Sequence, residues 1–115
     1  MGTRSITHTH KDGHILCSFY KHWDGYPSEY GRDLKRVLMK MNETTDIGDM
    51  AAQVIAAIKQ GPKDVYMIAA GQNDMGEEFT YDIYRKDDAW WITCTHVSKG
   101  VLYDGPVADF DTSVE

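Results

Sequence analysis

The residues of this chain best suited to chemistry are its histidines. His8 and His10 stand two residues apart in an alternating segment, so their side chains share one face of a strand. His14 follows closely, and His96 is a candidate neighbour across a sheet. Imidazoles brought together in this way suit zinc or nickel, but no ligand spacing supports such a site. We therefore expect exposed histidines on an edge strand, and we predict no metal ligand and no cofactor.

The remaining reactive side chains do not indicate a nucleophilic site. Ser18 precedes His22 by four residues, and about 3.3 Å per strand residue places the two roughly 13 Å apart. The sequence contains neither a nucleophile elbow nor a phosphate-binding glycine loop. Cys17 and Cys94 lie in apolar runs without a CxxC spacing, which is typical of free buried thiols. We predict no catalytic residue and no enzymatic activity, with a small phosphodiesterase as the third choice of function.

The segment YKHWDGYPSEYGRDLKRVL carries the most distinctive chemistry, at an expected turn from strand to helix. Trp23, Tyr26 and Tyr30 supply aromatic rings on which a base can stack. Gly31 and Arg32 follow at the helix start, where free N–H groups attract anions. The segment therefore predicts a small site for a phosphorylated aromatic ligand.

The same corner also has a purely structural interpretation, which the sequence leaves open. Gly25 follows Asp24 in a turn pair and is free to take a positive φ, while Pro27 pre-sets φ before the helix. Ser28 is then a plausible N-cap, and Gly31 permits close packing of the helix on the sheet. The corner is a ligand site, a subunit contact or a structural turn.

Aromatic and basic residues recur in the C-terminal half of the chain. Trp90 and Trp91 point to opposite faces of their expected strand, so one of them points away from the core side of the sheet. Arg85 lies in the preceding strand and is suited to phosphate. The complete set of predicted ligand-binding residues is Trp23, Gly25, Tyr26, Tyr30, Gly31, Arg32, Arg85 and Trp90.

Charge limits the classes of partner. The formal net charge of −6 and the isoelectric point near 5.2 weigh against a nucleic-acid polymer, whose backbone favours a basic stripe. A small anion needs only a few local basic groups, and an acidic surface also suits a protein that imitates nucleic acid toward a basic partner. No apolar run approaches the roughly 20 residues of a membrane span and no leader opens the chain, so we expect a cytoplasmic protein without membrane contact.

Hydrophobic periodicity predicts an α+β fold, with a mostly antiparallel sheet, two helices on one face and the order ββ-αα-βββ. We expect one domain, residues 1–115, in which the acidic residues 108–115 form a mobile tail. Exposed strand edges and spare aromatic rings favour a homo-oligomer. The expected strands are 4–10, 14–22, a buried one at 64–70, 79–86, 89–98 and a short final one in 99–105. The helices are 28–41 and a second that begins after Asp46 and stops before Gly61 and Pro62.

The N-terminal third of the chain resembles a group of small phage-encoded proteins, most of them without an assigned function. Their shared pattern is a TRS-[IL] start, a short hairpin and then Y-[RK]-H-x-DGYP-x-x-x-G-x-x-L. In length and pattern the chain is also similar to phage anti-defence proteins that sequester cyclic nucleotide signals of the Thoeris system. The first pattern reads here as Thr3-Arg4-Ser5-Ile6, then Tyr20-Lys21-His22-Trp23-Asp24-Gly25-Tyr26-Pro27, with Gly31 and Leu34.

The second resemblance implies a non-enzymatic, oligomeric binding protein and contributes only its ligand class, since no binding residues can be matched. Our leading hypothesis is therefore a phage counter-defence protein of the infected bacterial cell that sequesters a small signalling nucleotide, of the cyclic ADP-ribose or cyclic oligonucleotide type. The alternative is an acidic, anti-CRISPR-like inhibitor that imitates nucleic acid and occupies a host defence complex.

Overall fold

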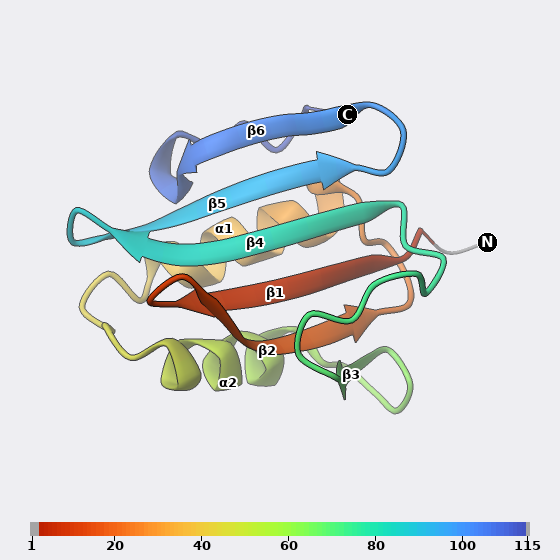
Figure 1. Cartoon of the computed structure of the whole chain (residues 1–115), viewed down its shortest axis with the longest axis horizontal. Coiled ribbons are helices and arrows are strands. Elements are labelled where there is room, and N and C mark those ends of the chain that lie inside the picture. Colours follow the sequence, from red (N-terminus) through yellow and green to blue (C-terminus); the bar gives the residue numbers. More distant parts are fainter. Residues whose placement is uncertain (1–2, 115) are drawn as a thin grey trace.

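The computed structural model describes residues 3–114, so residues 1, 2 and 115 of the predicted domain lie outside the described residues. A six-stranded sheet forms one layer and two helices pack on one of its faces (Figure 1), which confirms the α+β class. The strands are β1 (Ser5–Lys11), β2 (His14–Lys21), β3 (Val65–Ile68), β4 (Phe79–Lys86), β5 (Ala89–His96) and β6 (Gly100–Pro106). The helices are α1 (Arg32–Met39) and α2 (Ile47–Ile58), with a π-helical turn η1 (Pro27–Gly31) and a 3₁₀ turn η2 (Val107–Asp109).

The sheet is mixed rather than wholly antiparallel, with the strand order β3-β2-β1-β4-β5-β6. Every neighbouring pair is antiparallel except β1 and β4, which run parallel with Ser5 opposite Phe79 and Thr9 opposite Ile83. Four strands rather than three follow the helices. The expected order ββ-αα-βββ is therefore correct only in part.

The core lies between the sheet and the two helices. Alternation along β4 places Phe79, Tyr81 and Ile83 on the helical side, where all three are buried. The helices contribute apolar stripes, and α2 begins where the sequence predicts, because Oδ1 of Asp46 accepts a hydrogen bond from the N–H of Asp49 at 3.0 Å. The core side chains of the helices are Leu34, Val37 and Leu38 of α1 and Met50, Ala51, Val54 and Ile58 of α2.

Strand β1 is central and polar, which corrects the expected exposed edge strand. The strand lies between β2 and β4, and its residues Ser5, Thr7, His8 and Thr9 are all buried. Ser5, Thr7 and Thr9 lie on the face that the helices cover, and His8 lies on the other face against the loop that carries Gly71 and Asn73. Three of these side chains form hydrogen bonds with residues outside β1: Thr7 with the Tyr30 hydroxyl, His8 with Ser18 and Thr9 with the Cys17 carbonyl. The sheet is thus tied together by side-chain hydrogen bonds through its middle strand.

Three local predictions are also wrong. Ser28 is not an N-cap, since the π-turn begins at Pro27 and Tyr26 occupies the cap position without a side-chain hydrogen bond. Asp24, and not Gly25, takes the positive φ, at 57°. Strand β3 is an edge strand in which only Val65 is buried, rather than a buried strand.

The C-terminal segment packs on the core. Phe110, within the expected acidic tail, is completely buried, and Val114 packs against the same cluster. The Lys35 ammonium of α1 donates to the Phe110 carbonyl at 2.8 Å. Among residues 3–114 no helix is long and apolar enough to cross a membrane.

Candidate ligand cleft between the two hairpins

Gly25 of the predicted corner lets the backbone of the corner lie close to residues 3–5. Its N–H donates to the Thr3 carbonyl at 2.8 Å, and its carbonyl accepts from the Tyr81 hydroxyl at 2.7 Å. A Cβ at this position would lie 2.7 Å from the Ser5 Cβ and 2.9 Å from the Thr3 carbonyl oxygen. Glycine is therefore required at position 25 by the start of β1.

Tyr30 and Gly31 also face the interior. The Tyr30 hydroxyl lies 2.7 Å from Oγ1 of Thr7, and burial raises the pKa of Tyr30 far above its usual value. A Cβ on Gly31 would lie 3.4 Å from Cε2 of Phe110, so this glycine accommodates the C-terminal segment. Gly31 is buried, and Tyr30, only 1% exposed, contributes little to the small hollow that it lines together with Trp23.

The N–H groups at the start of the π-turn are already used. The Tyr30 N–H donates to the Asp24 carbonyl at 3.1 Å, and the N–H groups of Glu29 and Gly31 donate to the Tyr26 carbonyl at 3.0 and 3.4 Å. These bonds close the turn on itself. The corner therefore lacks the free helix-start donors on which the predicted anion site depended.

The exposed members of the corner do not converge on one site. Trp23 is 47% exposed and lines a small hollow beside Lys21, whereas Tyr26 lines a different hollow with His96. Arg32 is exposed, with its guanidinium 3.5 Å from the Glu29 carboxylate.

Arg85 and Trp90 lie at the opposite end of the sheet from the corner. Phe79 is the neighbour of Ser5, and six strand residues place Arg85 roughly 20 Å further along β4. Trp90 is buried on the helical face and its Nε1 donates to the Met41 carbonyl at 2.9 Å. The structure therefore separates the predicted site residues into two groups.

The Arg85 guanidinium rests 4.8 Å from the centre of the Trp90 ring. It donates to the carbonyls of Asn42 at 2.8 Å, Thr44 at 3.0 Å and Asp88 at 3.1 Å. Arg85 thereby fastens the loop between α1 and α2 to the end of β4. These partners are neutral, so they satisfy donors without cancelling the charge.

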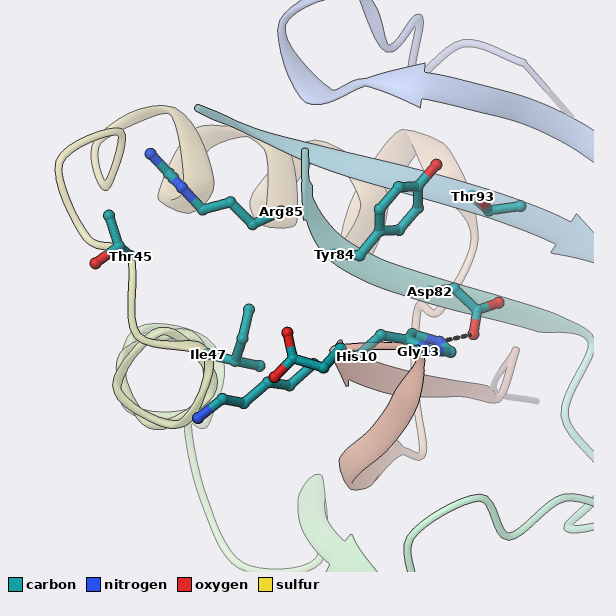
Figure 2. Close-up of a pocket in the computed structure, with 10 residues that line it drawn as sticks. His10, Gly13, Thr45, Ile47, Asp82, Tyr84, Arg85 and Thr93 are labelled. Atoms are coloured by element: carbon teal, nitrogen blue, oxygen red, sulfur yellow. Dashed lines mark hydrogen bonds and ion pairs between the residues drawn. The ribbon is translucent and has the colours of Figure 1, made fainter. Parts of the chain in front are cut away.

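A cleft of about 610 Å³ opens at the carboxyl ends of β1 and β4 (Figure 2). After Lys11 the chain turns toward β2, and after Lys86 it turns toward β5 on the opposite side. Parallel neighbours whose connections diverge in this way leave a crevice beyond their carboxyl ends, which is where open sheets commonly bind ligands. The cleft is lined by His10, Lys11, Asp12, Gly13, Thr45, Ile47, Asp82, Tyr84, Arg85 and Thr93.

The side chains of the cleft include two cations without an acidic partner. Nε2 of His10 lies 2.7 Å from Oδ1 of Asp82 (Figure 2), which occupies that carboxylate. Neither Lys11 nor Arg85 has a carboxylate within ion-pair distance among residues 3–114. Tyr84 adds a half-buried phenol ring. The lining therefore holds two cations and the two carboxylates of Asp12 and Asp82, so it offers local cationic groups rather than a net positive charge, together with an aromatic surface and an oriented imidazole.

The Tyr84 hydroxyl is also fixed at the rim of the cleft. It donates to Oδ1 of Asp104 at 3.0 Å, and the same oxygen accepts from the Thr93 hydroxyl at 2.8 Å. Burial and the Asp104 carboxylate raise the pKa of Tyr84, so the phenol stays neutral at physiological pH.

No family model, curated protein or solved structure matches this chain. Within residues 3–114, no three or more His, Cys, Asp or Glu side chains are grouped in a way that could hold a metal ion. Structural evidence for function therefore comes from the geometry of the cleft.

Sequence reasoning missed His10, Lys11 and Tyr84 as cleft residues. The alternation of β1 and β4 placed His10 on one face of its strand and Asp82 with Tyr84 on one face of theirs. The sequence pattern does not reveal that β1 pairs with β4. This pairing brings His10 onto the same face of the sheet as Asp82 and Tyr84.

A second missed arrangement links Ser18 to His8 rather than to His22. The Ser18 hydroxyl lies 2.6 Å from Nδ1 of His8, whose Nε2 lies 3.2 Å from Oδ1 of Asn73. The Gly71 N–H donates to the same hydroxyl at 2.9 Å. Ser18 and His8 are 0% and 3% exposed, so no substrate reaches them. This network fastens the loop between β3 and β4 to the sheet.

Proposed function

We propose that this chain is a binding protein that sequesters a small signalling nucleotide in the cleft between the β1–β2 and β4–β5 hairpins. The observation that carries the proposal is the cleft of about 610 Å³, in which Lys11 and Arg85 have no carboxylate partner among residues 3–114. That volume is typical of small-molecule sites. Phosphate contacts from the two cations and stacking on Tyr84 match the chemistry of a nucleotide.

The biological setting of the proposal rests on the N-terminal motif. The resemblance of Thr3 to Leu34 to phage-encoded proteins supports a phage origin, and the separate resemblance in length and pattern to phage anti-defence proteins supports a counter-defence role in the cytoplasm of an infected bacterium. A sequestering protein needs a site that binds the ligand without converting it. The buried Ser18 and His8 are consistent with such a site, since they are closed to substrates.

The alternative of an acidic mimic receives less support from the surface. The hollow beside Trp23 is lined by four carboxylates, those of Asp24, Glu29, Asp33 and Asp64. Three of these lie within 4.0 Å of a basic group of the same chain, namely Arg32, Arg36 and Lys21 respectively for Glu29, Asp33 and Asp64. Internal pairing reduces the attraction that a basic partner would feel.

The proposal includes association of several copies. Strands β3 and β6 are the two edges of the sheet, and Tyr66, Met67 and Val101 on them are more than 40% exposed. Unpaired edges with apolar side chains favour pairing with another chain. Light scattering during gel filtration measures the number of copies directly, and a monomer at every concentration would remove this part of the proposal.

Thermal denaturation with cyclic ADP-ribose and cyclic dinucleotides tests the binding function. A ligand at 100 times its Kd stabilises the fold by about 2.7 kcal/mol and raises the Tm by several degrees. Recovery of the ligand intact after denaturation separates sequestration from hydrolysis. No Tm shift with any of these nucleotides would contradict the proposal, and a shift only with basic protein or peptide would favour the acidic mimic.

Paired variants locate the binding site. Lys11→Ala removes a cation from the cleft and should weaken nucleotide binding by about tenfold, corresponding to the loss of one phosphate contact of about 1.4 kcal/mol. Arg32→Ala removes a cation from the corner and should leave the Kd unchanged. The reverse result would return the site to the corner.

A further inference from the structure

A second cavity, of about 570 Å³, lies beside the cleft on the other side of Arg85. Thr45 and Arg85 line both cavities, so the two share a wall. Trp90 forms part of the lining of the second cavity. Its other lining residues are Met39, Asn42, Glu43, Asp88, Ala89, Pro106, Val107 and Ala108.

Arg85 forms the partition between the two cavities. Its side chain leaves β4 and reaches the loop before α2, which carries Thr45 (Figure 2). The bonds to the Asn42 and Thr44 carbonyls hold the guanidinium across the gap. A molecule that occupies both cavities must cross the rim at this cation.

The group best accommodated at the partition is an anion. Three N–H groups of Arg85 donate to carbonyls, and the guanidinium keeps further donors without an acceptor among residues 3–114. A phosphate there would gain charge-assisted hydrogen bonds.

The carboxylates that line the two cavities confine the anion to the partition. Asp12 and Asp82 line the cleft, and Glu43 and Asp88 line the second cavity. Like charges repel a phosphate placed deep in either space. Neutral sugar and base groups fit beside these carboxylates, and a second phosphate is best placed at Lys11, which has no carboxylate partner among residues 3–114.

We infer that the two cavities form one site for a phosphodiester-linked dinucleotide, with one nucleoside arm in each cavity, one linking phosphate at Arg85 and, in a cyclic dinucleotide, the second linking phosphate at Lys11. This inference rests on the proposed function and narrows its ligand from small nucleotides in general to those with two bases. The base in the second cavity lies toward Trp90, and the base in the cleft lies toward Tyr84.

Calorimetric titration with cyclic di-AMP and with 3′,5′-cyclic AMP tests the inference on the full chain. Cyclic di-AMP should bind at least about tenfold more tightly, because its second arm binds within the same molecule. Equal Kd values would overturn the two-armed site while leaving the proposed function standing. Failure of both probes, together with every nucleotide of the thermal assay, would overturn the proposed function as well.

A cavity-filling variant tests the second cavity itself. Ala108 is exposed and lines that cavity, so Ala108→Trp should weaken the binding of cyclic di-AMP to about the affinity of cyclic AMP. Ala57→Trp is the matched control, since Ala57 is exposed on α2 and lines neither cavity. Unchanged cyclic di-AMP binding in a folded Ala108→Trp protein would overturn the inference.

Discussion

The corner between β2 and α1 and the cleft between the hairpins use similar residue types for opposite purposes. In the corner, Tyr30 and Gly25 are turned inward and their polar groups are paired within the chain. In the cleft, Tyr84 borders an open space and Lys11 has no carboxylate partner among residues 3–114. Aromatic and glycine-rich sequence thus marks a structural joint, whereas the cavity forms where the connections that follow two paired strands, β1 and β4, turn in opposite directions.

The largest expected effect is on the stability of the corner. Gly25→Ala places a Cβ 2.7 Å from Ser5 and 2.9 Å from the Thr3 carbonyl oxygen, neither of which can withdraw without moving β1. We expect a loss of about 3 kcal/mol in the free energy of unfolding and a Tm lower by about 10 °C. Chemical denaturation followed by tryptophan fluorescence measures the loss.

Gly61→Ala is the control for that substitution. No atom lies within 4 Å of a Cβ at Gly61, and its φ is not positive, so the change should be within about 0.5 kcal/mol. If Gly25→Ala were equally harmless, the corner would be open enough to accept a ligand, and the contrast with the cleft would disappear.

The second largest expected effect concerns Arg85, which lies between the cleft and the second cavity. Arg85→Met keeps the aliphatic stem but removes the donors to the Asn42 and Thr44 carbonyls. We expect a loss of about 2 kcal/mol, faster hydrogen exchange in residues 42–45 and weaker nucleotide binding.

Lys86→Met is the matched control on the same strand. The Lys86 ammonium lies 4.4 Å from the centre of the Trp91 ring on the face opposite the helices and lines neither cavity. We expect less than about 1 kcal/mol of destabilisation and no change in nucleotide Kd. Equal hydrogen exchange of residues 42–45 in the two variants would mean that Arg85 does not hold the loop.

A smaller effect separates the two tyrosines by pH. Burial raises the pKa of Tyr30 in the folded state above that in the unfolded chain, so the neutral phenol stabilises the fold fully below about pH 10. That stability is lost as pH rises above 10, because the unfolded state then releases the proton first. We expect the free energy of unfolding, measured from pH 8 to 11.5, to fall with rising pH in the original protein. In Tyr30→Phe the fall should be smaller, by up to about 1.4 kcal/mol per pH unit.

Tyr84→Phe should change the same slope much less, because Tyr84 is only partly buried. Burial also raises the pKa of Cys94 to about 12, and its contribution begins to fall near pH 9 in both variants alike. Identical slopes for the two variants would contradict the assignment of Tyr30 to the interior and Tyr84 to the cleft.

The smallest expected effect is at the surface of the corner. The Arg32 side chain is 61% exposed and its bridge to Glu29 is 3.5 Å long, so Arg32→Ala should cost no more than about 0.5 kcal/mol. A substantial loss of thermal stability in this variant would show that the exposed rim of the corner supports the fold.

Local patterns predicted most of the elements but not their arrangement. The alternation of β4 and the cap at Asp46 depend on neighbouring residues, and both are confirmed. The parallel pairing of Ser5 with Phe79 depends on residues far apart in the chain, and the polar pattern of β1 was mistaken for an edge. Because the cleft exists only through that pairing, its residues could not be grouped from the sequence.

The polar middle strand also has a consequence for synthesis on the ribosome. Strand β1 is made before its parallel partner, which begins only at Phe79, so one side of β1 stays unpaired while the intervening chain is made. An apolar strand waiting in this state would template aggregation, whereas Ser, Thr and His side chains do so poorly. We therefore expect the polar side chains of β1, which form internal hydrogen bonds in the folded protein, to limit aggregation of the nascent chain until the β4–β5 hairpin is made.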